Sequence, residues 1–237
     1  MPLQPASGTK DLNPKQVEIN HLLAKKIADV FRLWGYEEVA PPRVERLTTL
    51  MAGGAISNED IVKIVSDESL GLRPEMTASI ARAACTRLAI RRRPLRLYAT
   101  GTVFENRETV EGGISIEENL QCGVELLGIK GINAEIELLS MLLESIENLG
   151  IDSYQQPTLL IGDTSLMKLI LSDVNIRLKE KVRNALINYD YLTIRELEID
   201  NLLKEKILQI HACRGKPSEV LAKLEIILGK QNEIINL

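Results

Sequence analysis

Two stretches in which apolar and polar residues alternate constrain the fold more than any other feature of this sequence. They span residues 95–104 and 119–127, and a polar, glycine-bearing segment at 108–115 joins them. Alternation with a period of two predicts β-strands, and a modest polar connection predicts that they pair antiparallel. In the second stretch, the apolar residues that share one face are Leu120, Cys122, Val124 and Leu126.

Helical periodicity surrounds this pair of strands. Apolar residues spaced three and four apart predict helices at 15–34, 77–92 and 133–149, with Asn133 as the cap of the third. Along the first helix, the stripe expected to be buried is Ile19, Leu22, Leu23, Ile27, Val30, Phe31 and Trp34. Shorter strands are predicted at 36–40, 61–65, 70–72 and 158–161.

The character of the chain changes near residue 173. Lys, Glu, Asn and Leu dominate beyond this point, and 202–210 and 218–228 are typical of amphipathic helices. The sequence therefore predicts an α+β domain at 1–172, with a mostly antiparallel sheet flanked by helices. A mainly helical C-terminal region follows at 173–237.

Charge and cysteine content exclude several classes of protein. A net charge of −4 argues against a chain whose main task is to bind nucleic acid. The arginines at 87, 91, 92, 93 and 96 are either a solvated helix end or a phosphate or RNA contact. Three scattered cysteines and two histidines predict neither disulfides nor a metal site. With no signal peptide and no apolar run of about 18 residues, the sequence predicts a cytoplasmic protein away from membranes.

One polar constellation stands out against this background. Gln121, Gly123 and Glu125 share the face of the second strand opposite its apolar face, and Glu75 and Thr77 lie at a predicted strand-to-helix turn. Glycine weakens a strand unless something approaches its backbone closely. The group is either an exposed polar sheet face or a pocket floor whose two carboxylates suit a cationic ligand.

Three short segments resemble the catalytic core of histidyl-tRNA synthetases. They are Leu72-Arg73-Pro74-Glu75-Met76-Thr77, Gly101-Thr102-Val103-Phe104 and Gln121-Cys122-Gly123-Val124-Glu125, in the family's order and approximate spacing. The residues around Trp34-Gly35-Tyr36 and Pro41-Pro42 resemble the motif that forms the family's dimer interface. The lead-in Gly8-Thr9-Lys10-Asp11 is also similar, so the resemblance covers about residues 6–171 and implies a class II aminoacyl-tRNA synthetase-like fold.

The resemblance also implies a ligand and a role for each polar residue. By motif position, Glu75, Thr77 and Gln121 would bind the α-amino end of free histidine, and Glu125 would bind the imidazole. This agrees with the cation-friendly floor that the residues themselves suggest.

The departures from the family pattern concern ATP. Synthetases follow the phenylalanine of the second segment with an arginine that grips the α-phosphate, whereas Glu105 follows Phe104 here. The glycine-rich third motif has no counterpart, so we expect no catalytic residues and no cofactor. A core with these departures resembles the regulatory subunits of ATP phosphoribosyltransferase. That family implies a short-form catalytic subunit as partner in a hetero-oligomer, a homodimer through the first motif, and free histidine as effector.

Two alternatives stay open at the level of sequence. A divergent synthetase could activate histidine with Arg107 in place of the missing arginine. An RNA-binding paralogue could use Arg91, Arg92 and Arg93. The family's chains are normally longer, and the additional part supplies the other wall of the imidazole pocket. The chain is therefore expected to be either a natural short form or a truncated one.

Overall fold

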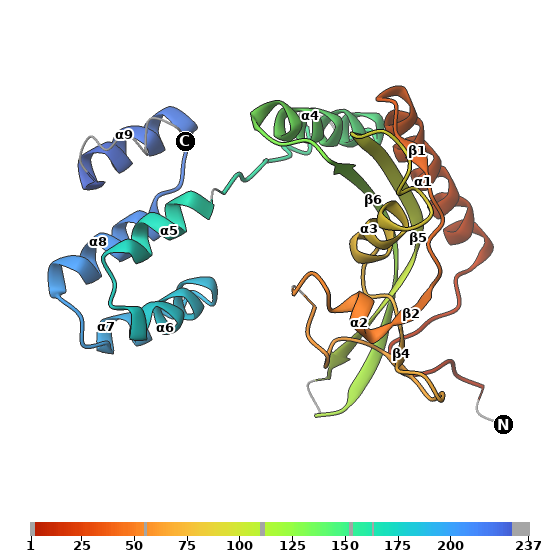
Figure 1. The fold of residues 1–237 in the computed structure, drawn as a ribbon, viewed down its shortest axis with the longest axis horizontal. Helices are drawn as coiled ribbons and strands as arrows, with labels where there is room; N and C mark the ends of the chain where they lie inside the picture. Colours follow the sequence, from red (N-terminus) through yellow and green to blue (C-terminus); the bar gives the residue numbers. More distant parts are fainter. Residues whose placement is uncertain (1–2, 55, 110–111, 152–153, 163, 229–237) are drawn as a thin grey trace. The chain divides into compact units, whose positions relative to one another are not determined.

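The computed structural model describes residues 3–54, 56–109, 112–151, 154–162 and 164–228. These residues form two compact units, Met1–Pro157 and Thr158–Leu237, which Figure 1 shows in one view. The sequence placed the boundary at 172/173. The structure places it earlier because α5 (Thr164–Ser172) contributes Ile170 to the core of the second unit.

The central sheet of the first unit has the strand order β1-β5-β6. β1 (Glu37–Glu38) runs parallel to β5 (Leu95–Glu108), and β5 pairs antiparallel with β6 (Ile114–Leu127). The predicted antiparallel pair is confirmed, and both strands are longer than predicted because pairing continues into the polar segment. The register runs without interruption from the Leu95–Leu127 pair to the Glu108–Ile114 pair, so residues 109–113 connect the two strands.

Helices cover both faces of this sheet (Figure 1). On one face, Leu97, Ala99 and Val103 of β5 pack against α3 (Thr77–Cys85). On the other, Tyr98 packs against buried residues of α1 (Pro14–Leu33) and α4 (Ile132–Asn148). Successive strand residues point to opposite faces, so the single β5 strand separates two apolar clusters. The α+β architecture agrees with the prediction.

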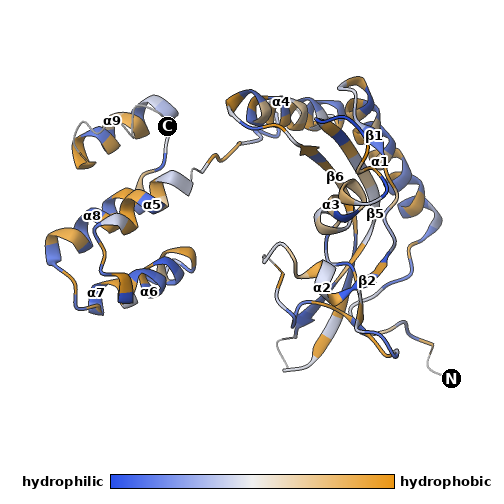
Figure 2. Cartoon of the chain, in the orientation of Figure 1, coloured by the Kyte–Doolittle hydropathy of each residue, from blue (hydrophilic) through white to orange (hydrophobic). Residues whose placement is uncertain are grey.

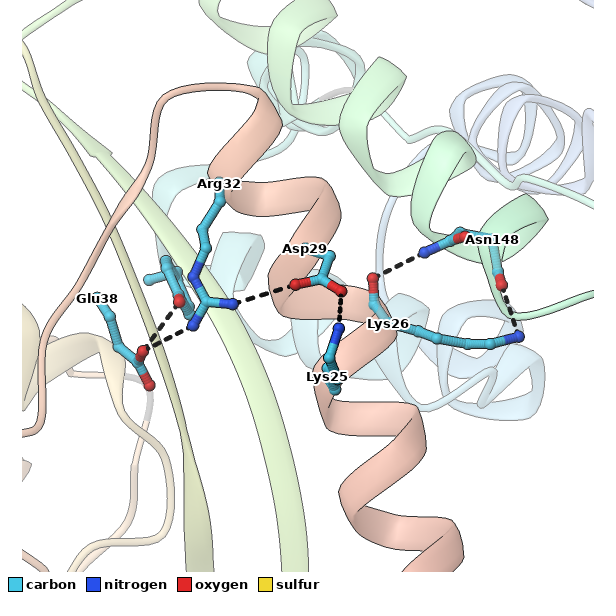
Figure 3. Close-up of polar contacts among 7 residues, drawn as sticks. Lys25, Lys26, Asp29, Arg32, Glu38 and Asn148 are labelled. Atoms are coloured by element: carbon cyan, nitrogen blue, oxygen red, sulfur yellow. Dashed lines mark hydrogen bonds and ion pairs between the residues drawn. The ribbon is translucent and has the colours of Figure 1, made fainter.

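α1 begins where the sequence predicts, with Asn13 and Gln16 forming a reciprocal capping box. Polar contacts then join it to α4, as Figure 3 shows. Lys26 Nζ donates to the carbonyl of Asn148 at 3.1 Å, and Asn148 Nδ2 donates to the carbonyl of Lys26 at 2.8 Å. At the C-terminal end of α1, Trp34 Nε1 donates to Glu144 at 2.7 Å. These contacts fix α1 and α4 as one layer.

Glu137 of α4 is the polar link between this layer and the sheet. It accepts hydrogen bonds from Arg96 Nε at 2.7 Å, Arg96 Nη2 at 2.8 Å and the buried Tyr36 hydroxyl at 3.0 Å. The Arg96 hydrogen bonds hold the pKa of Glu137 below its usual range, helped by Tyr36 and opposed by burial. The stabilisation is therefore present above the unfolded pKa and is lost as the pH falls through the folded pKa.

We expect Glu137→Ala to lower the free energy of unfolding by about 2–3 kcal/mol, since it strands a buried hydroxyl and a guanidinium. Urea unfolding at neutral pH measures this loss, which should shrink in acid. Glu135→Ala, at an exposed position on the same helix, is the matched control and should cost less than about 1 kcal/mol. Equal losses in the two variants would contradict the assignment.

A second, smaller sheet precedes α3. Its antiparallel order is β2-β4-β3, formed by β2 (Val44–Arg46), β4 (Leu70–Leu72) and β3 (Lys63–Ile64), with the short helix α2 (Leu47–Leu50) after β2. Glu45 of β2 is buried and accepts a bidentate ion pair from Arg82 of α3, with a shortest distance of 2.6 Å. This pair fixes α3 against the small sheet and so positions the turn at residues 73–76.

The second unit is helical throughout the part that the structure describes. After α5 come α6 (Ile176–Ile187), α7 (Tyr191–Glu196), α8 (Asn201–Ala212) and α9 (Pro217–Leu228). Each helix carries both apolar and polar residues (Figure 2), and the apolar ones gather in a cluster centred on Val182, Leu186, Ile194, Ile207 and Ile210. Asn175, Asp190 and Asp200 cap three of the helices. The amphipathic helices predicted at 202–210 and 218–228 are confirmed.

Four local predictions are wrong. Ile19, Leu22 and Leu23, in the stripe of α1 expected to be buried, are exposed. α3 ends at Cys85 instead of residue 92, and Arg93 Nη2 donates to the carbonyl of Ala84 at 2.9 Å near this end. The cap of α4 is Gly131 at φ 104°, not Asn133. Residues 158–161 form no strand, since no described strand pairs with them.

Candidate functional site

The predicted pocket floor lies on the face of the sheet against which α3 packs. The register pairs Gln121, Gly123 and Glu125 with Gly101, Ala99 and Leu97 respectively. Directly paired residues point to the same side of an antiparallel sheet. Because Leu97 and Ala99 pack against α3, the three floor residues also face that helix.

Gly123 leaves open space at the centre of the floor. A Cβ atom built on it would meet no atom within 4 Å. Its neighbour across the ladder, Ala99, is almost fully buried. The absence of a side chain at residue 123 therefore leaves open space above the sheet, between an amide and a carboxylate, and we call this space the recess.

The N-terminus of α3 supplies the other predicted residues. The Glu75 carboxylate accepts hydrogen bonds from the backbone nitrogens of Thr77 and Ala78, the latter at 2.9 Å. Met76 stands at the cap position and offers no side-chain acceptor. Glu75 thus satisfies the free N–H groups of the helix start, and its negative charge suits the helix dipole there. This bonding fixes Glu75 and the position of Thr77.

Glu125 is electrostatically coupled to both of these residues. Burial raises its pKa above the usual range, a hydrogen bond with Thr77 opposes this, and the charge of Glu75 adds to the rise. Two carboxylates near each other in a partly desolvated recess favour a cationic group between them. The structure therefore brings Glu75, Thr77 and Glu125 together. Gln121 lies on the same face, four residues before Glu125 in the strand, and has no described contact to the other three.

Arg73, which the sequence analysis did not single out as a candidate, lies beside the floor. Its side chain is 3% exposed, and it donates from Nε to the carbonyl of Thr102 at 2.9 Å and from Nη1 to that of Pro41 at 2.7 Å. Nη2 lies over Gly101, where a Cβ atom would clash with it. Burial lowers the pKa of Arg73, the charge of Arg43 adds to this, and Glu45 opposes it. The available signal was Gly101, a glycine inside a predicted strand.

Further along the same face lies a compact charge cluster. Arg107 Nη2 is 3.2 Å from Glu105, its neighbour on β5, and Arg107 Nε is 2.7 Å from Glu117 on β6. Glu105 and Glu117 are directly paired in the register. One guanidinium held by two carboxylates leaves a net negative charge, which disfavours a phosphate at this position.

Most of the arginine run makes contacts within the fold. Arg91 pairs with Glu37 at 2.6 Å, Arg96 with Glu137, and Arg93 donates to backbone carbonyls. Within the described ranges, no group of three or more His, Cys, Asp or Glu residues could hold a metal ion. None of the helices described is long and apolar enough to cross a membrane.

Comparison with known proteins places this geometry in context. The chain is 56% identical, over its whole length, to the ATP phosphoribosyltransferase regulatory subunit of Prochlorococcus marinus strain MIT 9303, of which it covers 60%. It thus spans about three fifths of the length of the curated relatives it matches.

Two solved structures have the same fold. The first is an ATP phosphoribosyltransferase regulatory subunit/histidyl-tRNA synthetase from Bacillus halodurans, with a TM-score of 0.86 and 21% identity over 99% of this chain and 61% of that one. The second is the histidyl-tRNA synthetase of Nostoc sp. PCC 7120, with a TM-score of 0.68 and 20% identity over 99% and 54%. A sequence model described as histidyl-tRNA synthetase matches residues 8–236. The chain, with its class II synthetase-like fold, therefore belongs to the histidyl-tRNA synthetase family.

Proposed function

We propose that the chain acts as a non-catalytic regulatory subunit of ATP phosphoribosyltransferase, the enzyme of the first step of histidine biosynthesis, and that it binds free histidine as a feedback signal. The observation that carries the proposal is the ion-paired cluster of Glu105, Arg107 and Glu117. It lies on the same face as an intact amino-acid floor. The regulatory-subunit name of the P. marinus relative supports the same reading.

The cluster argues against activation of histidine by ATP. The resemblance to synthetases puts a phosphate-gripping arginine at position 105, and a glutamate there exchanges an attraction for a repulsion. Each is of order 4 kcal/mol at close range near a surface. Arg107, the candidate replacement, is engaged by two carboxylates. Freeing it for phosphate would leave Glu105 and Glu117 unpaired beside an anionic ligand. This disfavours the divergent synthetase.

The residues proposed to bind histidine match the family's motifs. Glu75, Thr77 and Gln121 would hold the α-ammonium group, and Glu125 the imidazole. Glu125 is poised for this role because burial and Glu75 raise its pKa, so that a cation relieves an existing cost. A site that binds histidine without consuming it can only shift an equilibrium between states, which is what a feedback sensor requires.

The partners proposed are a second copy of the chain and a short-form catalytic subunit. Ile19, Leu22 and Leu23 continue the apolar stripe of α1, yet they are exposed within the chain, as are Ile132 and Ile136 on α4. Apolar residues in a stripe mark a surface that another protein covers. We assign this surface to a homodimer in the cytoplasm, with the catalytic subunit joining to form a hetero-oligomer.

The test mixes the purified chain with a short-form catalytic subunit from the same organism. We expect phosphoribosyl-ATP to form only when both chains are present, and its formation to fall as histidine is added. Sedimentation of each sample shows whether the chain self-associates and whether the subunits join. Catalytic activity that is independent of this chain would sink the proposal. Histidine-dependent exchange of pyrophosphate into ATP by the chain alone would instead establish the divergent synthetase.

A further inference from the structure

The proposed histidine site lacks an obvious partner for one of the ligand's three charged or polar ends. Glu75, Thr77, Gln121 and Glu125 suit an ammonium group and an imidazole. None of them is a cation, and two are anions that repel the α-carboxylate of a free amino acid. A positive group on the same face of the sheet would complete the match to a free amino acid.

Arg73 meets this requirement. Its guanidinium is buried, and neither hydrogen bond it makes is to a charged acceptor. The charge of Glu45 acts on the pKa of Arg73, but the Glu45 carboxylate already accepts hydrogen bonds from Arg82 Nε and Nη2. Across the described part of the chain, no carboxylate forms an ion pair with Arg73 and no acceptor binds its Nη2. A buried guanidinium without a counter-charge is costly unless another anion compensates it.

Solvent still reaches Nη2. Among the described residues, the one fully enclosed side-chain nitrogen or oxygen without a partner is Ser79 Oγ. Arg73 Nη2 also has no acceptor, and it is not among these enclosed atoms. It is therefore at least partly accessible to solvent.

The sheet register places Nη2 beside the recess. Nη2 lies over Gly101, which pairs with Gln121, and Gly123 is the next residue along that face. Diagonal neighbours on an antiparallel sheet lie roughly 7–8 Å apart, so Gly101 and Gly123 are within the span of one amino acid. A ligand seated over Gly123 thus has Glu75 and Glu125 on one side and Arg73 on the other.

Resting on the proposed function, we propose that Arg73 recognises the α-carboxylate of the bound amino acid through Nη2 and so makes the site selective for the free amino acid over its decarboxylated amine. The bare Gly101 has a purpose in this arrangement, because any side chain there would displace the guanidinium. Glu75, Glu125 and Arg73 together match the alternating charges of a free histidine.

The test compares histidine with histamine, which keeps the ammonium group and the imidazole but lacks the carboxylate. Calorimetric titration of the 237-residue chain should show histamine binding on the order of ten- to a hundredfold more weakly than histidine. Arg73→Gln should reduce histidine affinity by a similar factor and leave histamine affinity unchanged. Arg43→Gln is the matched control. It removes an exposed arginine whose charge also reaches Arg73, and it should leave the ratio of the two affinities as in the wild type.

The outcomes separate the possible roles. Equal affinity of the wild-type chain for the two ligands would overturn the inference, whatever the variants do. Equal losses of both ligands in Arg73→Gln would reduce Arg73 to a positioning residue and also overturn it. If Arg73→Gln fails to fold, Arg73→Lys retains the charge without the guanidinium fork and should show an intermediate ratio. Absence of all histidine binding in the wild type would instead overturn the proposed function, and this inference with it.

Discussion

Glu125→Gln is expected to reduce histidine affinity by roughly a hundredfold or more, and at the same time to make the free protein more stable at neutral pH. The loss of affinity follows from removing the carboxylate that faces the imidazole, since a charge-assisted hydrogen bond in a desolvated site is among the strongest polar contacts. The gain in stability follows from the burial of that carboxylate, which raises its pKa, and from the nearby charge of Glu75.

The sign of the pH dependence can be stated. A carboxyl group whose pKa is higher in the folded than in the unfolded state contributes stability in acid, and this contribution is lost as the pH rises through the folded pKa. At neutral pH the charged Glu125 therefore destabilises the folded protein, and replacement by glutamine removes this destabilisation. Urea unfolding should give Glu125→Gln a higher free energy of unfolding than the wild type at about pH 8, and a smaller difference at about pH 4.

Glu118→Gln is the matched control. Glu118 lies on the same strand, exposed, and an odd number of residues away, so it points to the opposite face. It should change neither histidine affinity nor the pH dependence of stability. Unchanged histidine affinity in Glu125→Gln would refute the assignment of the imidazole partner.

Two glycines on the floor side of the sheet should differ in how much folding stability they lose when replaced by alanine. Gly101→Ala should cost about 1–3 kcal/mol of folding free energy, the usual penalty for overpacking. The added Cβ would meet Arg73 Nη2, and two backbone carbonyls hold that guanidinium in place. Gly123→Ala should leave stability within about 0.5 kcal/mol of the wild type, because no atom lies within 4 Å of the added carbon.

Histidine affinity should fall in Gly123→Ala even though its stability does not. In Gly123→Ala the added methyl group occupies the recess itself, and one such group in a fitted pocket reduces affinity by roughly tenfold to a few hundredfold. Thermal unfolding and histidine titration of both variants measure the two quantities. A large loss of stability in Gly123→Ala, or full histidine affinity in it, would show that the space above residue 123 is not the binding recess.

Local patterns predicted the strands and helices well but not where they end. The alternation in residues 95–104 and 119–127 identified a real antiparallel pair, since one face of each strand is buried. The distal part of the hairpin is mostly polar, and Ile114 and Ile116 are its two apolar residues. The alternation there is too short to predict a strand. The helix predicted to residue 92 stops at Cys85, and local turns follow it: Leu88 N donates to the carbonyl of Ala83, and Arg93 Nη2 donates to that of Ala84. An apolar stripe alone does not mark this end.

The sequence predicted those residues of the candidate site whose relation follows from their spacing along the chain. Gln121, Gly123 and Glu125 share a face by the period of a strand, and Glu75 and Thr77 lie at a predicted strand-to-helix turn. Their roles toward histidine come from the resemblance and stay a prediction. Arg73 could not be found in this way. Its importance depends on which strand residue it covers, and that follows from the register of β5 with β6 and from the path of the turn before α3.

The uninterrupted ladder between β5 and β6 also restricts how this sequence can change length during evolution. Fourteen residue pairs align with no bulge, so one inserted or deleted residue in either strand would move every side chain beyond it to the opposite face. Such a change would exchange the polar recess for the apolar packing surface. Insertions and deletions are therefore tolerable chiefly in the turn at residues 109–113, and the spacing between the two strand motifs can vary only through that loop.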